Sequence, residues 1–459
     1  MPHKTVVIDV VGLTESRIGA HMPRLKAFAE SGMLTHLTPP LPAVTTTSQS
    51  AMLTGVPVHE HGIVGNGWYD RESAEVRFWK QSNRLVHAEK VWETARRRDP
   101  SVTCAQMFWW YNMYSSADWS VTPRPIYKAD GRKIPDCYSE PSELRDRLQA
   151  DLGAFPLFRF WGPAASIESS RWIAEASIRV DRAHDPTLSL IYLPHLDYAL
   201  QKFGPASEEA RAADTEIDAV VGSLLDHFQS RGARVLIVSE YGVEPVSEAV
   251  HINRVLRGEG LVRVREEEGL ELLDAGASRA FAVADHQVAH VYVRDAADLP
   301  AVKALCERTE GVDLVLDDEG KRGCAIDHER AGDLVLVSRP GRWFSYCYWL
   351  DDARAPDFAR TVDIHRKPGY DPCELFIDPA IRFPKLKIAA TLLKKKLGFR
   401  ALMDVIPLDT SLVRGSHGRP AGSPADGPVL IGDRGRSPGG VMPMEGVRDV
   451  ILESLFSGD

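Results

Sequence analysis

Short apolar runs alternate with longer amphipathic segments along most of the chain. The apolar runs, each of strand length, occupy residues 5–11, 187–193, 234–238 and 429–432. Segments with helical spacing of apolar residues occupy 22–32, 142–152, 166–182, 206–232 and 450–456. Continuous apolar runs are typical of strands buried on both faces, and their alternation with helices is typical of a parallel sheet. We therefore predict an α/β fold with a central, largely parallel sheet flanked by helices.

Polar side chains stand where three of these predicted strands end. Asp9 lies near the end of the first strand, Asp197 follows the run at 187–193, and Glu240-Tyr241 follows the run at 234–238. Open α/β sheets place their sites at the carboxyl ends of their strands. We therefore expect Asp9, Asp197 and Glu240 to belong to one site.

Two ranges interrupt the alternation. Residues 67–143 are rich in tryptophan and tyrosine, and we expect an insertion whose aromatic side chains form either a packed core or a substrate-facing wall. Residues 251–400 predict a second, α+β insertion, with strands near 289–293, 333–338 and 343–349 and a helix near 298–308. Both insertions are expected within a single catalytic domain that spans residues 1–459.

Composition narrows the range of partners. A net charge of -9 over 459 residues argues against a nucleic-acid polymer, which requires clustered lysine and arginine. A small phosphorylated molecule remains compatible if metal ions supply positive charge. The six cysteines show no CxxC spacing, and residues 1–8 contain no apolar stretch of signal-peptide length, so we expect a cytoplasmic protein.

The stretch from Pro42 to Asn66 reads PAVTTTSQSAMLTGVPVHEHGIVGN. It places three hydroxyls, Thr45 to Thr47, before a short helical pattern. Such residues commonly cap helices. A helix N-terminus also attracts anions, so a hydroxyl there can lie next to a phosphate.

This stretch resembles the alkaline phosphatase superfamily, and within it the nucleotide pyrophosphatase/phosphodiesterase branch. The branch has its nucleophile in a P-x-x-T segment before T-G, followed by H-G-I-x-x-N. The resemblance implies Thr45 as the nucleophile, with Thr46 and Thr47 as alternatives, and Asn66 as a donor to a phosphate oxygen. It also implies an alkaline-phosphatase-like core.

The resemblance further implies one or two divalent metal ions. Asp9, Thr45 and an Asp-His pair, replaced here by Glu240-Tyr241, would hold one ion. A D-x-x-x-H motif, here Asp197 with Gln201 in the histidine position, and His417 would hold the other. Oxygen donors suit Mn²⁺, Mg²⁺ or Ca²⁺ better than Zn²⁺. Further candidate ligands are His195, His365 and Asp371, whereas His286, in a later Asp-His pair, is expected to be structural.

These features predict a metal-dependent hydrolase of phosphate esters that resembles a phosphodiesterase or nucleotide pyrophosphatase. Because two imidazoles of the family pattern are missing, two alternatives stay open: an accessory protein that binds phosphate or metal without hydrolysis, or a phosphoryl transferase. A phosphonate hydrolase is a third. The basic segment 385–400 is expected to be a solvated helix face, with membrane contact as the alternative, and the oligomeric state is open.

Overall fold

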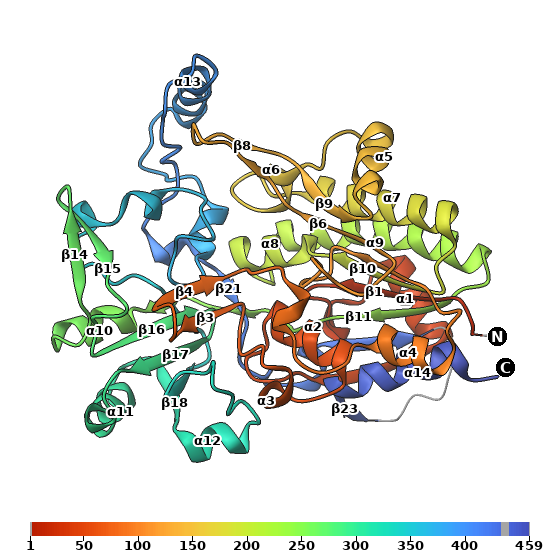
Figure 1. Ribbon diagram of the computed structural model, residues 1–459, viewed down its shortest axis with the longest axis horizontal. Coiled ribbons are helices and arrows are strands. Elements are labelled where there is room, and N and C mark those ends of the chain that lie inside the picture. Colours follow the sequence, from red (N-terminus) through yellow and green to blue (C-terminus); the bar gives the residue numbers. More distant parts are fainter. Residues whose placement is uncertain (1, 433–439, 459) are drawn as a thin grey trace.

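A central sheet of nine strands lies within residues 2–432 and 440–458, which the computed structural model describes (Figure 1). At its middle, β1 (Thr5–Val10) pairs in parallel with β10 (Leu188–Leu193) and β11 (Arg234–Val238). The order is β23-β2-β22-β11-β1-β10-β5-β6-β9, and the outer strands are β2 (Met33–Thr38), β5 (Cys104–Met107), β6 (Trp119–Pro123), β9 (Cys137–Glu140), β22 (Val429–Gly432) and β23 (Val441–Pro443). The predicted α/β sheet is confirmed.

Helices cover both faces of this sheet. On one face α7 (Ile167–His184) and α9 (Glu208–Ser230) pack against each other and against β10 and β11, next to α1 (Pro23–Ser31) and α8 (His195–Phe203). On the other, α14 (Val447–Phe456) packs on β1 and contacts α2 (Thr45–Thr54) and α4 (Val91–Arg98). The buried stripe of α9, which includes Ile217, Val221, Leu224 and Phe228, repeats at helical spacing and faces the sheet.

The aromatic-rich range 67–143 differs from the expected insertion, because β5, β6 and β9 all belong to the central sheet. These strands span four or five residues each, too short to stand out as apolar runs. The same range also forms the hairpins β3–β4 (Gly67–Asp70, Glu75–Phe78) and β7–β8 (Ile126–Tyr127, Lys133–Ile134). The boundaries of the insertion stay a prediction.

A second sheet lies at the other end of the molecule (Figure 1). Its order is β16-β17-β19-β18, with bounds Ala280–Asp285, Val288–Val293, Leu334–Ser338 and Val312–Leu316. The predicted strand at 343–349 is wrong beyond Phe344, where β20 (Arg342–Phe344) ends. Residues 345–349 are buried without being a strand, and a continuous apolar run does not distinguish these two cases.

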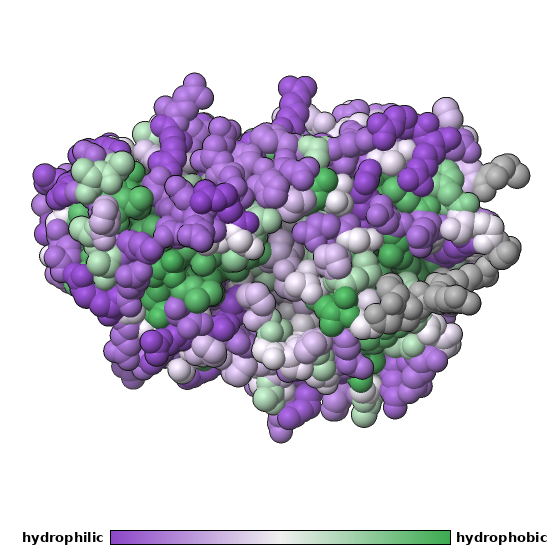
Figure 2. Space-filling view, turned by 90° about the horizontal axis from the view of Figure 1, so that it is seen from below, coloured by the Kyte–Doolittle hydropathy of each residue, from purple (hydrophilic) through white to green (hydrophobic). Residues whose placement is uncertain are grey.

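Smaller elements complete the described chain. The remaining helices are α3 (Val58–His61), α5 (Ser142–Leu152), α6 (Leu157–Phe160), α10 (Ile252–Gly258), α11 (Leu299–Glu307), α12 (Asp318–Gly323) and α13 (Pro384–Lys396). The remaining strands are β12 (Glu244–Pro245), β13 (Glu248–Val250), β14 (Val264–Glu267), β15 (Leu270–Leu273) and β21 (Gly415–Ser416). None of the described helices has the length and apolar character needed to cross a bilayer. The face in Figure 2, seen from the side opposite α13, is largely hydrophilic, with hydrophobic side chains in separate small areas.

Candidate active site

The carboxyl ends of three adjacent parallel strands bring the predicted residues together. Asp9 of β1 is in register with Tyr192 of β10 and Val238 of β11. Glu240 and Tyr241 follow β11 directly, and Asp197 lies in the first turn of α8, just after β10. All of these side chains are buried. The sheet therefore gathers them at one edge, as predicted from their positions after apolar runs.

Helix α2 begins at Thr45, and all of its residues are buried. Two of its hydroxyls bond within the helix: Ser50 Oγ donates to Thr46 O at 2.7 Å, and Thr54 Oγ1 donates to Ser50 O at 2.7 Å. Such bonds one turn back satisfy these two hydroxyls inside the buried helix, whereas Thr47 Oγ1 has no hydrogen-bond partner among the described residues. Gly55, in the left-handed conformation with φ 66°, ends the helix. The first turn therefore lies inside the protein, against the sheet edge.

One half of the site, the carboxylate pair, consists of Asp9 and Glu240 with Gln49 between them. Gln49 Nε2 donates to Glu240 Oε1 at 2.6 Å and to Asp9 Oδ2 at 3.3 Å. Its Oε1 accepts from the Trp110 backbone N–H at 2.7 Å, which fixes the orientation of the amide. Within the described chain, Asp9 Oδ1 and Glu240 Oε2 are buried without a hydrogen-bond donor.

Burial dominates the acidity of this pair. It raises the pKa of Asp9 well above the ordinary value, and the nearby negative charge of Glu240 raises it further. Burial also raises the pKa of Glu240, to about 7, against hydrogen bonds from its neighbours that lower it. Ionising two adjacent buried carboxyls costs a large free energy, so a proton or a cation is needed to offset the charge of the pair.

The other half of the site, the bonded half, is built around Asp197. Gln201 Nε2 donates to Asp197 Oδ2 at 2.7 Å, and Tyr241 Oη donates to Asp197 Oδ1 at 3.4 Å. Gln201 Oε1 in turn accepts from Tyr370 Oη at 2.9 Å. Burial raises the pKa of Asp197 to about 7. Both oxygens of this carboxylate are therefore bonded by side chains of the protein.

Tyr241 joins the two halves. Its hydroxyl lies 3.2 Å from Thr45 Oγ1. Burial, followed by the charges of Asp197 and Glu240, raises the pKa of the phenol well above 10, so it stays protonated. Since its single proton goes to Asp197, the phenol oxygen accepts from Thr45. A hydrogen-bonded chain thus runs from Thr45 through Tyr241 to Asp197.

His417 lies beside this chain. Its Nδ1 is 2.9 Å from Ala43 O, and its Nε2 is 3.8 Å from Asp197 Oδ1. Nε2 is buried and has no hydrogen-bond partner among the residues described. Burial lowers the pKa of His417 well below the ordinary value, so the ring is neutral and donates its Nδ1 proton to Ala43.

Asn66 bonds to protein groups at the start of α2 and at the end of β16. Its Oδ1 accepts from the Thr46 backbone N–H at 3.1 Å, and its Nδ2 donates to Asp285 Oδ1 at 3.1 Å. Asn66 thereby satisfies one of the free N–H groups at the start of α2. Its role as a donor to a phosphate oxygen stays a prediction that the second Nδ2 proton would have to fulfil.

Four rings in a column link the second sheet to the site; the two outer pairs are stacked, and the middle pair, His286 and His417, is tilted by 36°. The rings of Tyr370 and His286 are 3.6 Å apart, those of His286 and His417 3.8 Å, and those of His417 and Tyr241 3.5 Å. His286 Nδ1 is 2.8 Å from Asp285 Oδ1, just past the end of β16. His286 also lines the cavity described below, so it belongs to the site and is not merely a structural residue beside the second sheet.

The three extra ligand candidates do not join the carboxylates. His195 Nε2 bonds Glu216 of α9 at 2.8 Å. Asp371 pairs with the buried Lys367 at 2.6 Å, and Lys367 also pairs with Glu374 at 2.8 Å. His365 Nδ1 lies 3.4 Å from Phe78 O and lines the outer cavity. Each of these side chains therefore has a local partner that accounts for its position.

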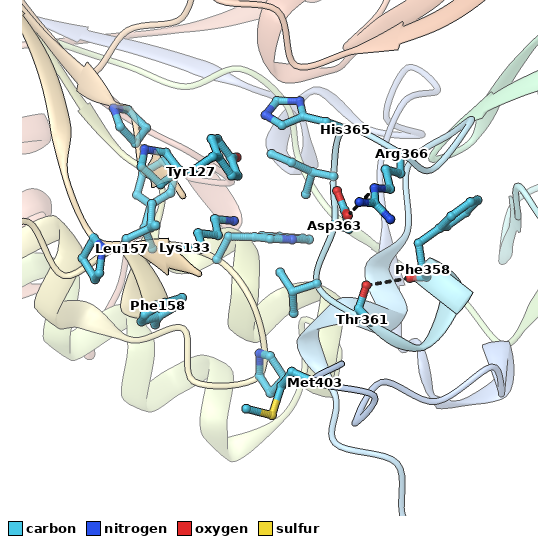
Figure 3. A pocket seen from close by; sticks show the side chains of 18 of the residues that line it. Tyr127, Lys133, Leu157, Phe158, Phe358, Thr361, Asp363, His365, Arg366 and Met403 are labelled. Carbon is cyan, nitrogen blue, oxygen red and sulfur yellow. Dashed lines mark hydrogen bonds and ion pairs between the residues drawn. The ribbon is translucent and has the colours of Figure 1, made fainter. Parts of the chain in front are cut away.

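A cavity of about 1390 Å³ leads from this site to the surface. Thr45, Asp197, Tyr241 and His286 lie along its inner end, with Trp79 and Trp110 beside them. Figure 3 shows side chains on two facing walls of the cavity: Tyr127, Lys133, Leu157 and Phe158 on one, and Phe358, Thr361, Asp363, His365, Arg366 and Met403 on the other. The aromatic-rich range thus supplies part of a wall that faces the cavity.

The donor set can be compared with the metal sites implied by the resemblance. In the described residues, no group of three or more His, Cys, Asp or Glu side chains is placed to hold a metal ion. Gln201 and Tyr241, which replace the two imidazoles, donate hydrogen bonds to Asp197, so a zinc pair of the family type does not fit. One hard cation fits the carboxylate pair, because Asp9 Oδ1 and Glu240 Oε2 are buried oxygens that lack a donor.

Three parts of the site were not predicted from the sequence. Gln49 is four residues from Thr45, so it lies on the same face of α2, and that spacing was the available signal. Asp285-His286 lies in the turn of the β16–β17 hairpin, and no periodicity indicates which end of a hairpin meets the core. Tyr370 follows Pro368-Gly369 in a segment without regular structure.

The sheet order, the buried hydroxyl at the start of α2 and the acidic strand ends define an α/β protein with an alkaline-phosphatase-like fold. Residues 5–371 match the model of the type I phosphodiesterase / nucleotide pyrophosphatase family. The chain belongs to this family.

Two curated relatives align with about half of the chain. An uncharacterized pyrophosphatase/phosphodiesterase of Schizosaccharomyces pombe is 24% identical over 237 residues, which are 49% of this chain and 41% of that protein. Ectonucleotide pyrophosphatase/phosphodiesterase family member 1 of Rattus norvegicus is 25% identical over 262 residues, 54% of this chain and 24% of the relative. The chain therefore spans less than half the length of either relative.

Solved structures share the fold over nearly the whole chain. Phosphonoacetate hydrolase from Sinorhizobium meliloti 1021, in complex with phosphonoformate, has a TM-score of 0.62 at 17% identity, covering 98% of this chain and 96% of that one. An inactive murine ectonucleotide pyrophosphatase/phosphodiesterase 5 in complex with AMP has a TM-score of 0.58 at 14% identity, covering 100% and 96%. At these identities the likeness establishes the fold.

Proposed function

We propose that the protein hydrolyses a small phosphate ester, more plausibly a diester or nucleotide-like molecule than a simple monoester, with Thr45 as the nucleophile. The observation that carries the proposal is the bonded chain from Thr45 Oγ1 through Tyr241 Oη to Asp197 Oδ1, at 3.2 and 3.4 Å, at the inner end of the cavity. The family and the complexes of related folds with phosphonoformate and AMP support a phosphorylated substrate.

The chain of hydrogen bonds provides a path for the proton of the nucleophile. As Thr45 Oγ1 attacks phosphorus, its proton passes to Tyr241 Oη and the phenol proton passes to Asp197. The P–O bond to the leaving alcohol breaks, and this alcohol takes its proton from water in the cavity and leaves through it. Because the pKa of Asp197 is raised to about 7, this carboxylate can accept a proton near neutral pH. Water then cleaves the phospho-threonine, and the proton on Asp197 can return along the same path.

Charge explains why a cation belongs in this proposal. An anionic phosphoryl group next to Thr45 would face Asp9, Glu240 and Asp197, and like charges at close range repel strongly in a buried site. A hard cation held by Asp9 and Glu240, when bound, would offset this repulsion and polarise the phosphoryl oxygens. Gln49 and Trp110 would then keep the two carboxylates in place.

The test measures hydrolysis of bis-p-nitrophenyl phosphate, p-nitrophenyl phosphate and phosphonoacetate by metal-stripped protein, with Mn²⁺, Mg²⁺, Ca²⁺ or Zn²⁺ added back. The expected result is turnover of the diester with a hard cation, and acid-stable phosphate on Thr45 after quenching. Preferred cleavage of phosphonoacetate would instead assign a phosphonate hydrolase.

A binding protein without hydrolysis is the second candidate, and the bonded half of the site favours it. Gln201 and Tyr241 each donate to one oxygen of Asp197, so His417 Nε2 is the ligand atom of this half left without a partner among the described residues, too few for a second cation. AMP binding measured by calorimetry, without turnover of any of the three substrates under any cation, would support this alternative.

A further inference from the structure

Helix α13 presents an apolar stripe to solvent. Leu386, Ala390, Leu393 and Leu397 recur at i, i+4, i+7 and i+11, and the three leucines are 68%, 57% and 66% exposed. In α13, the buried residue is Thr391. An amphipathic helix normally buries its apolar stripe against the core, whereas here the stripe faces outward. Figure 1 shows α13 projecting from the body of the molecule, close to the β7–β8 hairpin.

The apolar surface continues beyond the helix. Phe383, just before α13, and Phe399, just after it, are 61% and 65% exposed. Leu402 is also exposed. Residues 383–402, which we name the α13 platform, therefore gather seven large exposed apolar side chains: Phe383, Leu386, Leu392, Leu393, Leu397, Phe399 and Leu402. Single exposed leucines are ordinary, but a contiguous group of this size is typical of an interaction surface.

The charge of the platform is opposite to that of the whole chain. Residues 383–402 contain six basic residues and no acidic one, in a chain of net charge -9. Lys387 pairs with Asp404 at 2.8 Å, which leaves the other basic side chains around the apolar stripe. Leucine and phenylalanine surrounded by lysine are typical of helices that lie in the interface of an anionic bilayer.

The platform also forms part of the cavity wall. Ile388, Leu392 and Lys395 line the cavity, opposite Tyr127 and Lys133 of the β7–β8 hairpin. Arg400 Nη2 donates to Ala129 O at 3.0 Å and so ties the end of the platform to the turn of that hairpin. The mouth of the cavity therefore opens beside the exposed apolar stripe, while its inner end reaches Thr45.

We propose that the α13 platform docks on an anionic lipid surface and places the mouth of the cavity against it. The apolar stripe enters the acyl boundary, and the surrounding lysines contact lipid phosphates. A protein partner fits less well, because a ring of basic side chains without acidic ones gives little specificity of pairing, whereas an anionic bilayer matches both the charge and the apolar stripe. Docking does not depend on the proposed hydrolysis. One consequence does rest on the proposed function, namely that an amphiphilic ester enters the cavity from the bilayer.

The experiment uses co-sedimentation of the full chain with vesicles of phosphatidylcholine alone or mixed with phosphatidylglycerol. Binding to the mixed vesicles, weakened by salt, is expected. Leu393→Glu should weaken it by at least about tenfold, because a charge at the acyl boundary opposes insertion. The matched control is Leu350→Glu, since Leu350 is 59% exposed outside the platform, and it should bind like the native chain.

A second variant tests the charge. Lys385→Gln/Lys394→Gln should reduce binding about 25-fold, since each lysine near an anionic surface contributes on the order of fivefold. Thermal melting confirms that each variant is folded. Thr45→Ala should bind vesicles normally, so a failure of hydrolysis leaves docking intact and the two failures can be told apart.

Three results would overturn the proposal. The first is no binding of the native chain to mixed vesicles, and the second is equal binding by Leu393→Glu and Leu350→Glu. The third is a dimer in solution, seen by sedimentation velocity, that Leu393→Glu dissociates while vesicle binding is unchanged. That outcome would assign the stripe to contact between copies of this chain.

Discussion

The two halves of the candidate site use the same device with different results. In each, a glutamine amide donates to a buried carboxylate: Gln49 to Asp9 and Glu240, and Gln201 to Asp197. The carboxylate pair keeps two oxygens without a donor among the described residues, whereas Tyr241 bonds the second oxygen of Asp197. The first half therefore retains unmet negative charge, and the second has become a hydrogen-bonded relay. We expect one cation, held in the first half.

The largest effect is expected at Thr45, where the two halves meet. Thr45→Ala should lower kcat at least about 10⁴-fold, the order of loss typical for removal of a nucleophile. Thr47→Ala is the matched control, because Thr47 is equally buried in the same turn and its hydroxyl has no partner in the described structure. Steady-state hydrolysis of the diester checks both. Loss of activity in Thr47→Ala, with activity kept in Thr45→Ala, would instead identify Thr47 as the nucleophile.

Replacing either glutamine by glutamate adds a carboxylate to one half of the site, and the two variants therefore compare the halves directly. Gln49→Glu should lower the free energy of unfolding by about 3 kcal/mol, the order of cost of an uncompensated buried charge, and Mn²⁺ should restore most of it. Gln201→Glu should be destabilised similarly, with little recovery on adding Mn²⁺. Denaturant unfolding with and without chelator measures both. Equal recovery in the two variants would contradict a single cation site.

Tyr241→Phe tests the relay. It removes the hydroxyl between Thr45 and Asp197 but keeps a ring to stack on His417, so kcat should fall about 10²-fold with KM nearly unchanged. Tyr370→Phe removes another buried hydroxyl of the same half without touching Thr45, and should cost much less. Comparable losses in kcat for the two variants would argue against proton transfer through Tyr241.

The smallest effect concerns pH. In the folded chain the pKa of both Asp197 and Glu240 is about 7, against ordinary values of 3.8 and 4.5. Between these limits the folded chain holds protons that the unfolded chain has lost, so stability in chelator should fall as pH rises from about 4 to about 7 and then level off. Asp197→Asn removes one of these titrating groups, so the stability of this variant, measured by melting curves, should depend less steeply on pH. A stability that rises over this interval would contradict the assignment.

Much of the fold and part of the site followed from local patterns. Asp9 lies near the end of an apolar run, Asp197 and Glu240 follow shortly after such runs, and parallel strands bring these positions to one edge. The strands β5, β6 and β9 are too short to be read this way, which is why their range looked like an insertion. The role of Gln49 could not be predicted for another reason. Its amide is oriented by the Trp110 backbone N–H, which is distant in the sequence.

The column of four rings also has a mechanical consequence. Tyr370 and His286 come from the segment and hairpin beside the second sheet, while His417 and Tyr241 border the central sheet. Any hinge motion between the two sheets would have to separate His286 from His417, because Tyr241 and Thr45 both belong to the central part of the molecule. Such a motion would take His286 and Tyr370 away from the inner end of the cavity and leave the relay from Thr45 to Asp197 in place, so the ring contacts oppose opening of the cavity.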